Sequence, residues 1–526
     1  MTLPAELYTA AQVRELDRRA IASGISGFEL MSLAGRVAFN AILRHWQACR
    51  TLVILAGTGN NGGDGFVLAA LASAADIRVT VLQCGDPHAI KGDALQAREQ
   101  ALARGIDVKD FSIAAFNDAT GNCKPEAVLV DALLGTGFSG PLRGVYAEAV
   151  TAINHSTLPV LALDVPSGLC SSTGSIHQDA VRAAMTVTFV ALKQGLFTGK
   201  GPACCGEIVF HNLDTDHVPP LLPSSRRIDI QSVVSLCKPR AADTHKGDCG
   251  HVLVVGGELG FGGAALMAAE SAARSGAGTI SLLTRSAHIG AALARRPELM
   301  VHGIDNIEPA HAELKRFETL LKRADVIVAG PGLGRSKWSR QLLQGVLQQG
   351  LQHDLRHDLQ HNVRRTILVL DADALNLLSE DAGRIKRRDN WIFTPHPGEA
   401  ARLLGCETAQ IQADRFTAVR QLQAMWGGAC VLKGAGSLLC YEKDGQQYVD
   451  VCAEGNPGMA SGGMGDVLSG IIAAFIAQGL SLADGLRAGV CVHGESADLA
   501  AAASGQRGLL ATDLFPYLRG LINFAR

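Results

Sequence analysis

The sequence lacks any cysteine arrangement typical of a secreted scaffold. Its 13 cysteines include no Cys-x-x-Cys pair and show none of the dense, regular spacing of a disulfide framework. The opening segment carries Glu6, Glu15 and Asp17 where an export signal would need a basic start and then an apolar run. We therefore expect a reduced, cytoplasmic protein.

Long apolar runs and an excess of basic charge are also missing. The longest apolar stretches, such as 183–192 and 470–477, are far shorter than the roughly 20 residues of a membrane-spanning helix. The 48 Lys and Arg residues stand against 50 Asp and Glu residues, which leaves a formal net charge of −2. No basic field is present that could hold nucleic acid without sequence preference. We expect a soluble protein that binds neither a membrane nor nucleic acid.

Glycine, by contrast, is abundant. It accounts for 59 of the 526 residues, which is about 11% against a usual level near 7%. Many of these glycines follow short runs rich in β-branched residues, a pattern typical of α/β folds. Because the chain is too long for one ordinary domain, we expect two or three domains with large apolar cores.

Buried parallel strands are predicted in both halves of the chain. In the first half they span 51–56, 79–84, 127–133 and 159–165, which predicts a Rossmann-like doubly wound sheet. In the second half the pattern restarts at 251–257, 279–284, 325–332, 366–373 and 429–436, which predicts a second α/β domain. The stretch 217–227 is rich in Pro and Ser and predicts a surface connection. We place the boundary there, with domains at 1–222 and 223–526.

A polar stretch near residues 348–365 contains His353, His357 and His361 at four-residue spacing, which would line one face of a helix. One interpretation is metal binding, and the other is a solvated helix extension. We favour the solvated extension, because Asp354 and Asp358 would lie one position away from the histidine face.

The loop 57–65 has the sequence GTGNNGGDG and precedes an apolar helix that we expect to begin at Phe66. Backbone N–H groups in such a loop, together with the N-terminus of a helix, can bind a phosphate. The loop matches neither a Walker loop nor Gly-x-Gly-x-x-Gly. A tight turn would explain its glycines, but it would not explain the Asn60, Asn61 and Asp64 side chains among them.

Two further strands of the first half carry aspartates at or near their ends. Asp131 is followed by the loop 133–141, and Asp164 is followed by the sequence VPSG. Because the carboxyl ends of the strands line the crevice of a doubly wound sheet, the three loops should converge. A single aspartate at such a place is more often a cap or turn former, but three such loops in one domain favour a functional site.

Together, GNNGGDG, GTGFSGP and DVPSG resemble the NAD(P)H-hydrate epimerase domain, also called the YjeF N-terminal domain, over nearly all of residues 1 to about 215. The resemblance implies that Asp164 is the catalytic acid/base and that K+ binds Asn61, Asp131 and Ser167. Lys193 is a candidate second participant, with a solvated charge as the alternative. The implied substrate-binding residues are Asn60, Asn61, Gly62, Gly63, Asp64, Gly135, Thr136, Gly137, Phe138, Ser139, Gly140, Pro141 and Asp164.

The most informative stretch of the second half is NPGMASGGMGD at 456–466, which leads into an apolar helix. Glycine N–H groups ahead of a helix can form an anion hole for a transferring phosphoryl group, with Asp466 beside it as a base. A helix-capping aspartate is the alternative. The additional Gly-rich loop at 433–437 favours nucleotide binding.

Other loops join this stretch in a fixed order, at 245–257, 260–265, 330–334, 371–376 and 394–404. As a set they resemble the ADP/ATP-dependent NAD(P)H-hydrate dehydratase, which is the YjeF C-terminal domain of the ribokinase-like superfamily, over about residues 230–520. The resemblance implies that Ala264, Gly332, His396 and Asp466 contact the hydrate. It also implies that ADP or ATP is the phosphoryl donor and that Mg2+ bridges its phosphates. The implied nucleotide-binding residues are Lys433, Gly434, Ala435, Gly436, Ser437, Asn456, Pro457, Gly458, Met459, Ala460, Ser461, Gly462, Gly463, Met464 and Gly465.

The two resemblances imply one bifunctional repair enzyme, both isomerase and lyase. It would interconvert the R and S forms of hydrated NADH and NADPH and dehydrate the S form, because a stereospecific dehydratase can rescue only one epimer. Two alternatives stay open: a ribokinase-like kinase of a vitamin precursor, and an N-terminal domain that only binds a ligand. We also expect a homo-oligomer.

Overall fold

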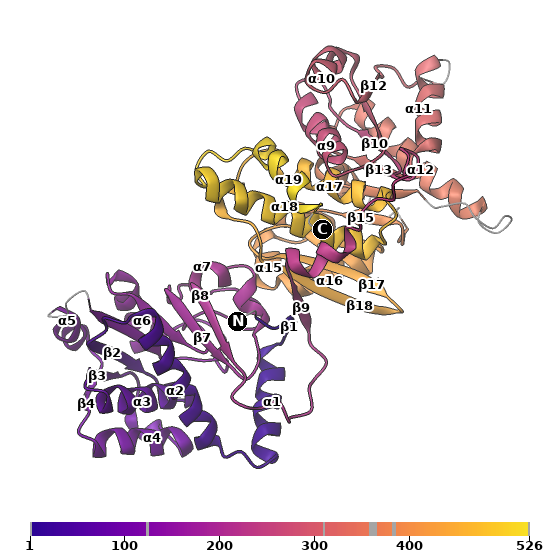
Figure 1. The fold of residues 1–526 in the computed structure, drawn as a ribbon. Coiled ribbons are helices and arrows are strands. Elements are labelled where there is room, and N and C mark those ends of the chain that lie inside the picture. The colour runs from indigo at the N-terminus through magenta and orange to yellow at the C-terminus, as the bar shows by residue number, and fades with distance from the viewer. Residues whose placement is uncertain (1–2, 122–125, 309–310, 357–365, 381–385, 524–526) are drawn as a thin grey trace. The chain divides into compact units, whose positions relative to one another are not determined.

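The computed structural model describes residues 3–121, 126–308, 311–356, 366–380 and 386–523. The chain divides into two compact units, Met1–Arg227 and Ile228–Arg526 (Figure 1). Among the described residues, no helix has both the length and the apolar character needed to cross a lipid bilayer.

The first unit is built on a seven-stranded sheet with the strand order β4-β3-β2-β5-β6-β7-β8. All of its neighbouring strands pair in parallel. The chain runs outward from β2 to β4 and then returns to β5 on the other side of β2, so the strand order reverses between β2 and β5. The strands are β2 (Thr51–Ala56), β3 (Arg78–Gln83), β4 (Asp107–Asp110), β5 (Ala127–Ala132), β6 (Val160–Leu163), β7 (Met185–Phe189) and β8 (Glu207–His211).

Helices cover both faces of this sheet (Figure 1). Leu52 and Ile54 of β2 face a core shared with α2, α3 and α4, whereas Val53 and Leu55 face a core shared with α5 and α6. This alternation confirms the expected doubly wound α/β sheet. The helices are α1 (Ala10–Ala22), α2 (Gly27–His45), α3 (Asn60–Ala74), α4 (Gly92–Ala103), α5 (Ile113–Gly121), α6 (Val145–His155) and α7 (Gly201–Cys205).

The expected start of α3 at Phe66 is wrong, because the helix begins at Asn60. Its glycines serve close packing inside the helix and do not form a turn ahead of it. A Cβ atom on Gly62 would lie 2.1 Å from the carbonyl oxygen of Gly57, and one on Gly65 would lie 2.7 Å from Cβ of Ala132. This close fit against β2 and β5 offsets the low helix propensity of glycine, about 1 kcal/mol per residue.

The second unit contains a mixed sheet in which the strands of residues 251–452 have the order β18-β17-β16-β15-β14-β13-β10-β11-β12. The pairs from β16 to β12 are parallel, and β17 pairs antiparallel with both β16 and β18. The strand order reverses between β10 and β13. The strands are β10 (His251–Val255), β11 (Thr279–Thr284), β12 (Met300–Gly303), β13 (Val326–Ala329), β14 (Ile367–Leu370), β15 (Trp391–Phe393), β16 (Ala429–Leu432), β17 (Ser437–Lys443) and β18 (Gln446–Cys452).

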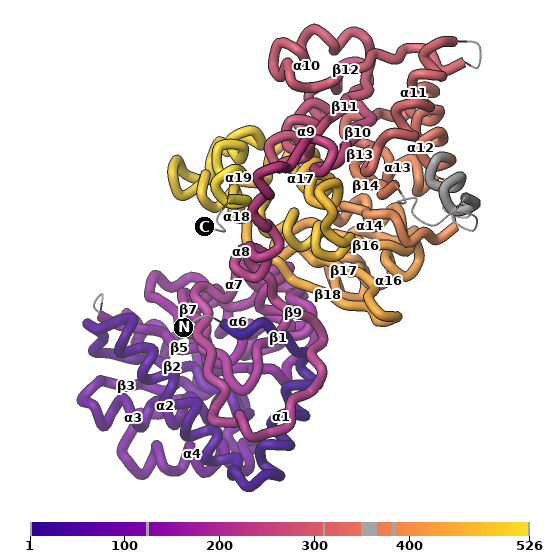
Figure 2. The backbone as a smooth tube through the Cα atoms, turned by 45° about the vertical axis from the view of Figure 1, so that its right-hand side comes forward, coloured from indigo at the N-terminus to yellow at the C-terminus, as the bar shows by residue number. Residues whose placement is uncertain are grey.

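The core of the second unit lies between this sheet and the helices α9, α17 and α18, which are drawn together in Figure 2. Every residue of α17 from Val467 to its end is buried, which explains why that helix is apolar on all sides. The helices are α8 (Ile230–Val233), α9 (Gly262–Arg274), α10 (Ile289–Arg295), α11 (Ala312–Arg323), α12 (Lys337–Arg356), α13 (Ala372–Glu380), α14 (Pro397–Leu404), α15 (Thr408–Ala413), α16 (Arg415–Trp426), α17 (Met464–Ala477), α18 (Leu482–Ser504) and α19 (Phe515–Leu521).

Two further sequence expectations concern segments outside these cores. The surface connection expected at 217–227 is interrupted at Ser225, where strand β9 (Ser225–Ile228) begins. This strand pairs antiparallel with β1 (Glu6–Leu7), and Ser225 is buried. Of the spaced histidines, His353 belongs to α12, whereas His357 and His361 lie outside the described residues.

Candidate active sites

The three loops predicted to converge in the first unit lie together at the carboxyl ends of β2, β5 and β6. Gly57 after β2 approaches Leu133 after β5 so closely that a Cβ atom on Gly57 would lie 1.9 Å from the Leu133 carbonyl oxygen. A Cβ atom on Gly135 would lie 3.2 Å from Oδ2 of Asp164 and 3.4 Å from Cγ of Asn61. This meeting point is the position where the strand order reverses, which is where ligands bind in such sheets.

Asp164 and Lys193 form an ion pair at the centre of this site. The Lys193 side chain is 1% exposed, and its Nζ lies 2.5 Å from Oδ1 of Asp164. Nζ also donates to the carbonyl oxygen of Phe189 and to Oγ1 of Thr188. The alternative of a solvated lysine is therefore wrong. Burial acts to raise the pKa of Asp164, but the Lys193 charge and hydrogen bonds from Lys193 and Thr136 hold it below its ordinary value.

The backbone of Asp164 has a left-handed conformation, with φ of 64°. Oδ2 of this carboxylate accepts hydrogen bonds from the backbone N–H and the hydroxyl of Thr136, at 3.0 and 2.5 Å. A non-glycine residue in this conformation costs about 1–3 kcal/mol and is found most often at functional sites. This backbone conformation directs the Asp164 carboxylate between Thr136, in the loop after β5, and Lys193.

Two more carboxyl groups, those of Asp17 and Asp64, interact with the same ion pair. Burial raises the pKa of Asp17 to about 6. Burial, followed by the charges of Asp164 and Asp17, raises the pKa of Asp64 well above its ordinary value. Asp17 was missed as a site residue, although its spacing from the buried Val13, Leu16 and Ala20 puts it on the inner face of α1.

We call Asn61, Asp131 and Ser167 the floor of the site. Asp131 lies near the end of β5, and the loop after β5 contacts the other two, through Gly135 at Asn61 and through the Leu134 N–H, which donates to the Ser167 hydroxyl. Oδ1 and Oδ2 of Asp131 accept hydrogen bonds from the Ser167 hydroxyl and backbone N–H, at 2.7 and 2.8 Å. Burial raises the pKa of Asp131 to about 6 in spite of these bonds. The Asn61 side chain is buried, and neither its Oδ1 nor its Nδ2 has a hydrogen-bond partner among the described residues. A buried polar side chain without a protein partner is a candidate group for binding a ligand or ion.

The other predicted residues of the first unit lie around this floor. Gly62 and Gly63 are buried in the first turn of α3, and the side chain of Asn60 is exposed at its start. The segment Gly137–Pro141 lies at the partly exposed edge of the β5 loop. Among the described residues, no hydrogen bond joins the start of α3 or the segment Gly137–Pro141 to Asp164. The predicted role of both segments therefore depends on a ligand large enough to reach them.

In the second unit, Asp371, Lys433 and Ser469 come together from three separate elements. Nζ of Lys433 lies 2.9 Å from Oδ1 of Asp371, and the Ser469 hydroxyl donates to Oδ2 of Asp371 at 2.6 Å. Nζ of Lys433 also lies 3.9 Å from Oε2 of Glu399. A Cβ atom on Gly465 would lie 3.0 Å from this Nζ, so the start of α17 borders the same cluster. The loops after β14, β15 and β16 thus meet the N-terminus of α17.

Asp466 lies in the first turn of α17, beside N–H groups that have no partner within the helix. Burial, followed by the negative charge of Asp371, raises the pKa of Asp466 to about 7, while Lys433 opposes the shift. A carboxyl with this pKa can exist as a base near neutral pH. The adjacent helix N-terminus favours an anion such as phosphate.

His396 has a structural role that the sequence did not reveal. Its Nδ1 accepts hydrogen bonds from the backbone N–H groups of Gly398 and Glu399, so it caps α14. Burial lowers the pKa of His396, and the charges of Lys433 and Arg402 lower it further. The side chain is 52% exposed, which leaves it accessible to a ligand.

Ala264 and Gly332 lie together where the strand order of the second unit reverses. A Cβ atom on Gly332 would lie 3.1 Å from Cβ of Ala264. Gly463, the N-cap of α17, lies against Met267 of the same α9 helix that contains Ala264. Ala264 and Gly332 are therefore neighbours, and the N-terminus of α17, which carries Asp466, packs against the helix that contains Ala264.

The Gly-rich segment Lys433–Ser437 is shaped by Arg415, a residue that the sequence analysis missed. Arg415 is 1% exposed, and its guanidinium donates to the carbonyl oxygens of Leu432, Lys433 and Gly436. Burial lowers the pKa of Arg415 to about 10. Arg415 could not be recognised from a sequence motif, because it bonds to backbone carbonyl oxygens, which every residue has.

The second predicted nucleotide-binding segment, Asn456–Gly465, begins with a 3-10 turn at Pro457–Met459 and ends in the first turn of α17. Nδ2 of Asn456 and the backbone N–H of Gly455 donate to the two carboxylate oxygens of Asp498, at 2.9 and 2.8 Å. The buried hydroxyl of Ser461 has no hydrogen-bond partner among the described residues. It is therefore able to bind a ligand.

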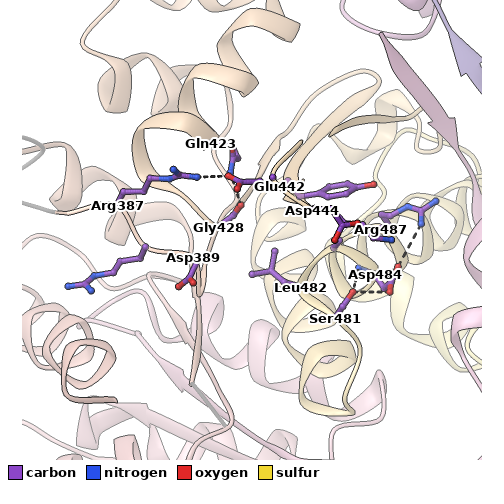
Figure 3. A pocket seen from close by; sticks show the side chains of 15 residues that line it. Arg387, Asp389, Gln423, Gly428, Glu442, Asp444, Ser481, Leu482, Asp484 and Arg487 are labelled. Carbon is purple, nitrogen blue, oxygen red and sulfur yellow. Dashed lines mark hydrogen bonds and ion pairs between the residues drawn. The ribbon is translucent and has the colours of Figure 1, made fainter. Parts of the chain in front are cut away.

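A cavity of about 700 Å³ in the second unit lies away from these loops (Figure 3). Its lining includes Arg387 and Asp389 before β15, Gly428 before β16, and the turn Glu442–Gly445 after β17. These segments lie at the amino ends of the parallel strands β15 and β16. Since ligands of α/β sheets bind at the carboxyl ends, this cavity is not the candidate active site.

Comparison with known proteins divides the chain in the same way. A family described as "YjeF-related protein N-terminus" matches residues 27–195, and a family described as "NAD(P)H-hydrate dehydratase" matches residues 252–519. The bifunctional NAD(P)H-hydrate repair enzyme of Coxiella burnetii is 46% identical over 522 residues, covering 98% of this chain and 99% of the relative. That of Escherichia coli is 39% identical over 527 residues, covering 99% and 95%.

Among solved structures, a ribokinase-like superfamily protein from Enterococcus faecalis is 28% identical with a TM-score of 0.49, covering 58% of this chain and 97% of the other. An ADP/ATP-dependent NAD(P)H-hydrate dehydratase from Bacillus subtilis, co-crystallised with ATP/Mg2+, is 26% identical with a TM-score of 0.46, covering 56% and 95%. The C-terminal unit is an α/β domain with a mixed sheet, and its sequence matches the NAD(P)H-hydrate dehydratase family.

Proposed function

Because this chain belongs to the family of bifunctional NAD(P)H-hydrate repair enzymes, we propose that its two loop clusters are the two active sites of that repair. The chain is an NAD(P)H-hydrate epimerase and an ADP/ATP-dependent NAD(P)H-hydrate dehydratase. We assign the epimerase to residues 1–222 and the dehydratase to residues 223–526. The observation that supports this assignment best is the pairing, in each site, of an aspartate held by a lysine with a second carboxyl of raised pKa.

In the epimerase site, the ionised Asp164 is the base and the neutral Asp64 carboxyl is the acid. Environments that push the pKa values of two carboxyls apart support such a division of roles. Asp64 donates a proton to the departing hydroxyl of the hydrated ring, and Asp164 accepts a proton from the water that adds to the other face. The two carboxyls exchange protons with solvent between turnovers. The remaining predicted residues, from Asn60 to Gly63 and from Gly135 to Pro141, surround the dinucleotide.

The floor of the epimerase site fits the proposed K+. Hard cations prefer oxygen ligands, and Asn61 Oδ1 is buried without a partner among the described residues, beside Gly135 of the loop after β5. A bound cation would supply positive charge next to the buried Asp131 carboxylate. The Ser167 hydroxyl, which already bonds to Asp131, would complete the oxygen set.

Replacing K+ by Li+ in the assay buffer is expected to slow epimerisation by about tenfold or more, equivalent to about 1.4 kcal/mol of transition-state stabilisation. Asn61→Ala should be slow in both salts, because it removes one ligand. The measurement is the rate of interconversion of the two hydrate epimers at constant ionic strength. Equal rates of the unmodified chain in both salts would contradict the assignment, and dehydratase turnover serves as the control for salt effects on the nucleotide.

In the dehydratase site, Asp466 removes the proton from the ring hydroxyl as the phosphoryl group is transferred to it. Phosphorylation converts hydroxide into a good leaving group. Loss of phosphate, with release of a proton from the neighbouring ring carbon to solvent, then restores the nicotinamide ring. Lys433 and the N–H groups at the start of α17 stabilise the charge that develops on the transferring group. Ala264, Gly332 and His396 contact the hydrate, and the segments Lys433–Ser437 and Asn456–Gly465 hold ADP or ATP. Mg2+, bound with the nucleotide, neutralises the phosphate charge.

Dehydration is expected to slow as the pH falls below about 7. Burial raises the pKa of Asp466 to about 7, and only the ionised form can accept the proton. Below this pKa, kcat/KM should fall about tenfold per pH unit, and above it the rate should level off. The measurement is the pH profile of kcat/KM for the S hydrate at saturating Mg2+ and nucleotide. A profile that stays flat between about pH 5.5 and 7 would exclude Asp466 as the base with this pKa.

A single assay tests the proposed function as a whole. The full chain is given an epimer mixture of hydrated NADH together with ADP, ATP or neither, and the return of NADH absorbance is followed. Full recovery with nucleotide is expected. Recovery that stops at one epimer would contradict the epimerase assignment, and accumulation of a stable phosphorylated product would indicate a kinase.

The homo-oligomer expected from the sequence remains part of the proposal, and sedimentation equilibrium tests it.

A further inference from the structure

A cluster of potential metal ligands lies outside both proposed active sites. It consists of Cys452 at the end of β18, Glu454 two residues later, and Cys491 in α18. One ligand atom from each lies within 4.8 Å of the others. In the part of the chain that the structure describes, this is the one group of three or more His, Cys, Asp or Glu side chains with that geometry. Both thiols are buried, with 1% and 0% exposure.

The distances within this cluster match tetrahedral coordination of a zinc-like cation. With Zn–S bonds of about 2.3 Å and Zn–O bonds of about 2.1 Å, tetrahedral angles separate two sulfur ligands by about 3.8 Å and a sulfur from an oxygen by about 3.6 Å. The two Sγ atoms are 3.8 Å apart, and Sγ of Cys452 lies 3.7 Å from Oε2 of Glu454. The side chains would therefore need little movement to bind the cation.

The surroundings of the cluster also favour a cation. The charged neighbours that act on Glu454 and Cys491 include Asp229 and Glu495, and both are acidic. The second carboxylate oxygen of Glu454, Oε1, accepts a hydrogen bond from the backbone N–H of Ile230 at 2.6 Å, which fixes the orientation of the carboxylate. Such an outer hydrogen bond is typical of carboxylates that ligate a metal.

We propose that Cys452, Glu454 and Cys491 bind one Zn2+ ion, which joins the end of β18 to α18. Two thiols would release their protons to solvent as the metal binds, and water would fill the fourth position. Glu454 is followed closely by Gly455 and Asn456, which are bonded to Asp498 in the same α18 helix. The ion would thus be a structural clamp at the start of the segment Asn456–Gly465. Zinc binding itself does not depend on the proposed function of that segment.

The test is the metal content of the full chain after exposure to Zn2+ under reducing conditions and gel filtration. We expect about one ion per chain that is lost in Cys491→Ala and in Glu454→Gln. Glu454→Gln keeps an oxygen acceptor for the Ile230 N–H, so it tests ligation with little effect on the fold. The matched control is Cys430→Ala, because Cys430 is buried and lies opposite Cys440 across the β16–β17 pair without forming such a cluster.

A second measurement separates this site from any zinc held by the histidine-rich stretch. Co2+ bound to the cluster should give a thiolate-to-cobalt charge-transfer band in the near ultraviolet, which histidine ligands cannot give. The band should be present in the Cys430→Ala variant and absent in Cys491→Ala. Equal zinc content in all four proteins or a missing charge-transfer band would each overturn the proposal.

Discussion

Replacing Asp466 by asparagine is expected to reduce nucleotide-dependent dehydration of the S hydrate by about 10²- to 10⁴-fold, the usual contribution of a general base. Asparagine keeps the shape of the side chain but cannot accept the proton. The fold should be retained, because Lys433 keeps its ion pair with Asp371 at 2.9 Å and because a partly buried carboxyl of raised pKa is removed. The measurement is kcat with saturating nucleotide, together with Tm.

The same protein molecule contains the internal control for this variant. Epimer interconversion by Asp466→Asn should equal that of the unmodified chain, since the epimerase residues all belong to the other unit. Asp444→Asn is the matched variant, because Asp444 is exposed, belongs to the same unit and has a positive φ that asparagine tolerates. Dehydration within about threefold of normal in Asp466→Asn would rule out Asp466 as the base.

Asp164→Asn should have the opposite effect, with epimerisation reduced by about 10²- to 10⁴-fold and dehydration of the S hydrate unchanged. Asparagine adopts the left-handed backbone of Asp164, with φ of 64°, more readily than almost any other residue. However, the variant leaves the buried Lys193 ammonium without its carboxylate, which costs about 3–5 kcal/mol. A loss of epimerase activity could then follow from local unfolding alone.

A double variant separates these two explanations. Asp164→Asn combined with Lys193→Met removes both charges, so Tm should return toward the normal value while epimerisation stays low. Recovery of epimerisation together with Tm would show that the carboxylate acts only through stability. Asp118→Asn, which changes an exposed carboxylate on α5 of the same unit, is the control for charge alone.

The sequence did not predict β7 and β15, although both are fully buried inside their sheets. It predicted the other interior parallel strands of both sheets, because these strands are mostly apolar along their length. The strands β2, β5, β10 and β14 are examples. The edge strands β4, β8 and β12 were not expected, since exposed or half-buried residues interrupt their apolar pattern. The start of α3 was misplaced because its glycines were interpreted as a loop, whereas close packing against β2 and β5 requires them.

Candidate site residues on Gly-rich loops could be proposed from the sequence, but the residues that hold them in place could not. Asp371, which holds Lys433, was noticed only as part of a loop, and Arg415 was not noticed at all. A salt bridge between residues 62 positions apart, or a guanidinium bonded to backbone oxygens, leaves no local spacing to recognise. Asp17 is the exception, because its helical spacing with Val13 and Ala20 was visible in the sequence.

The position of Lys433 has a thermodynamic consequence for nucleotide binding. Its ammonium is held between Asp371 and Glu399 by groups of the protein itself. A free lysine side chain loses about 2 kcal/mol of rotamer entropy when it is immobilised, and here folding has already removed that freedom. Association with the nucleotide should therefore carry a smaller entropic penalty than it would with a mobile lysine, and the phosphate should meet a preorganised charge.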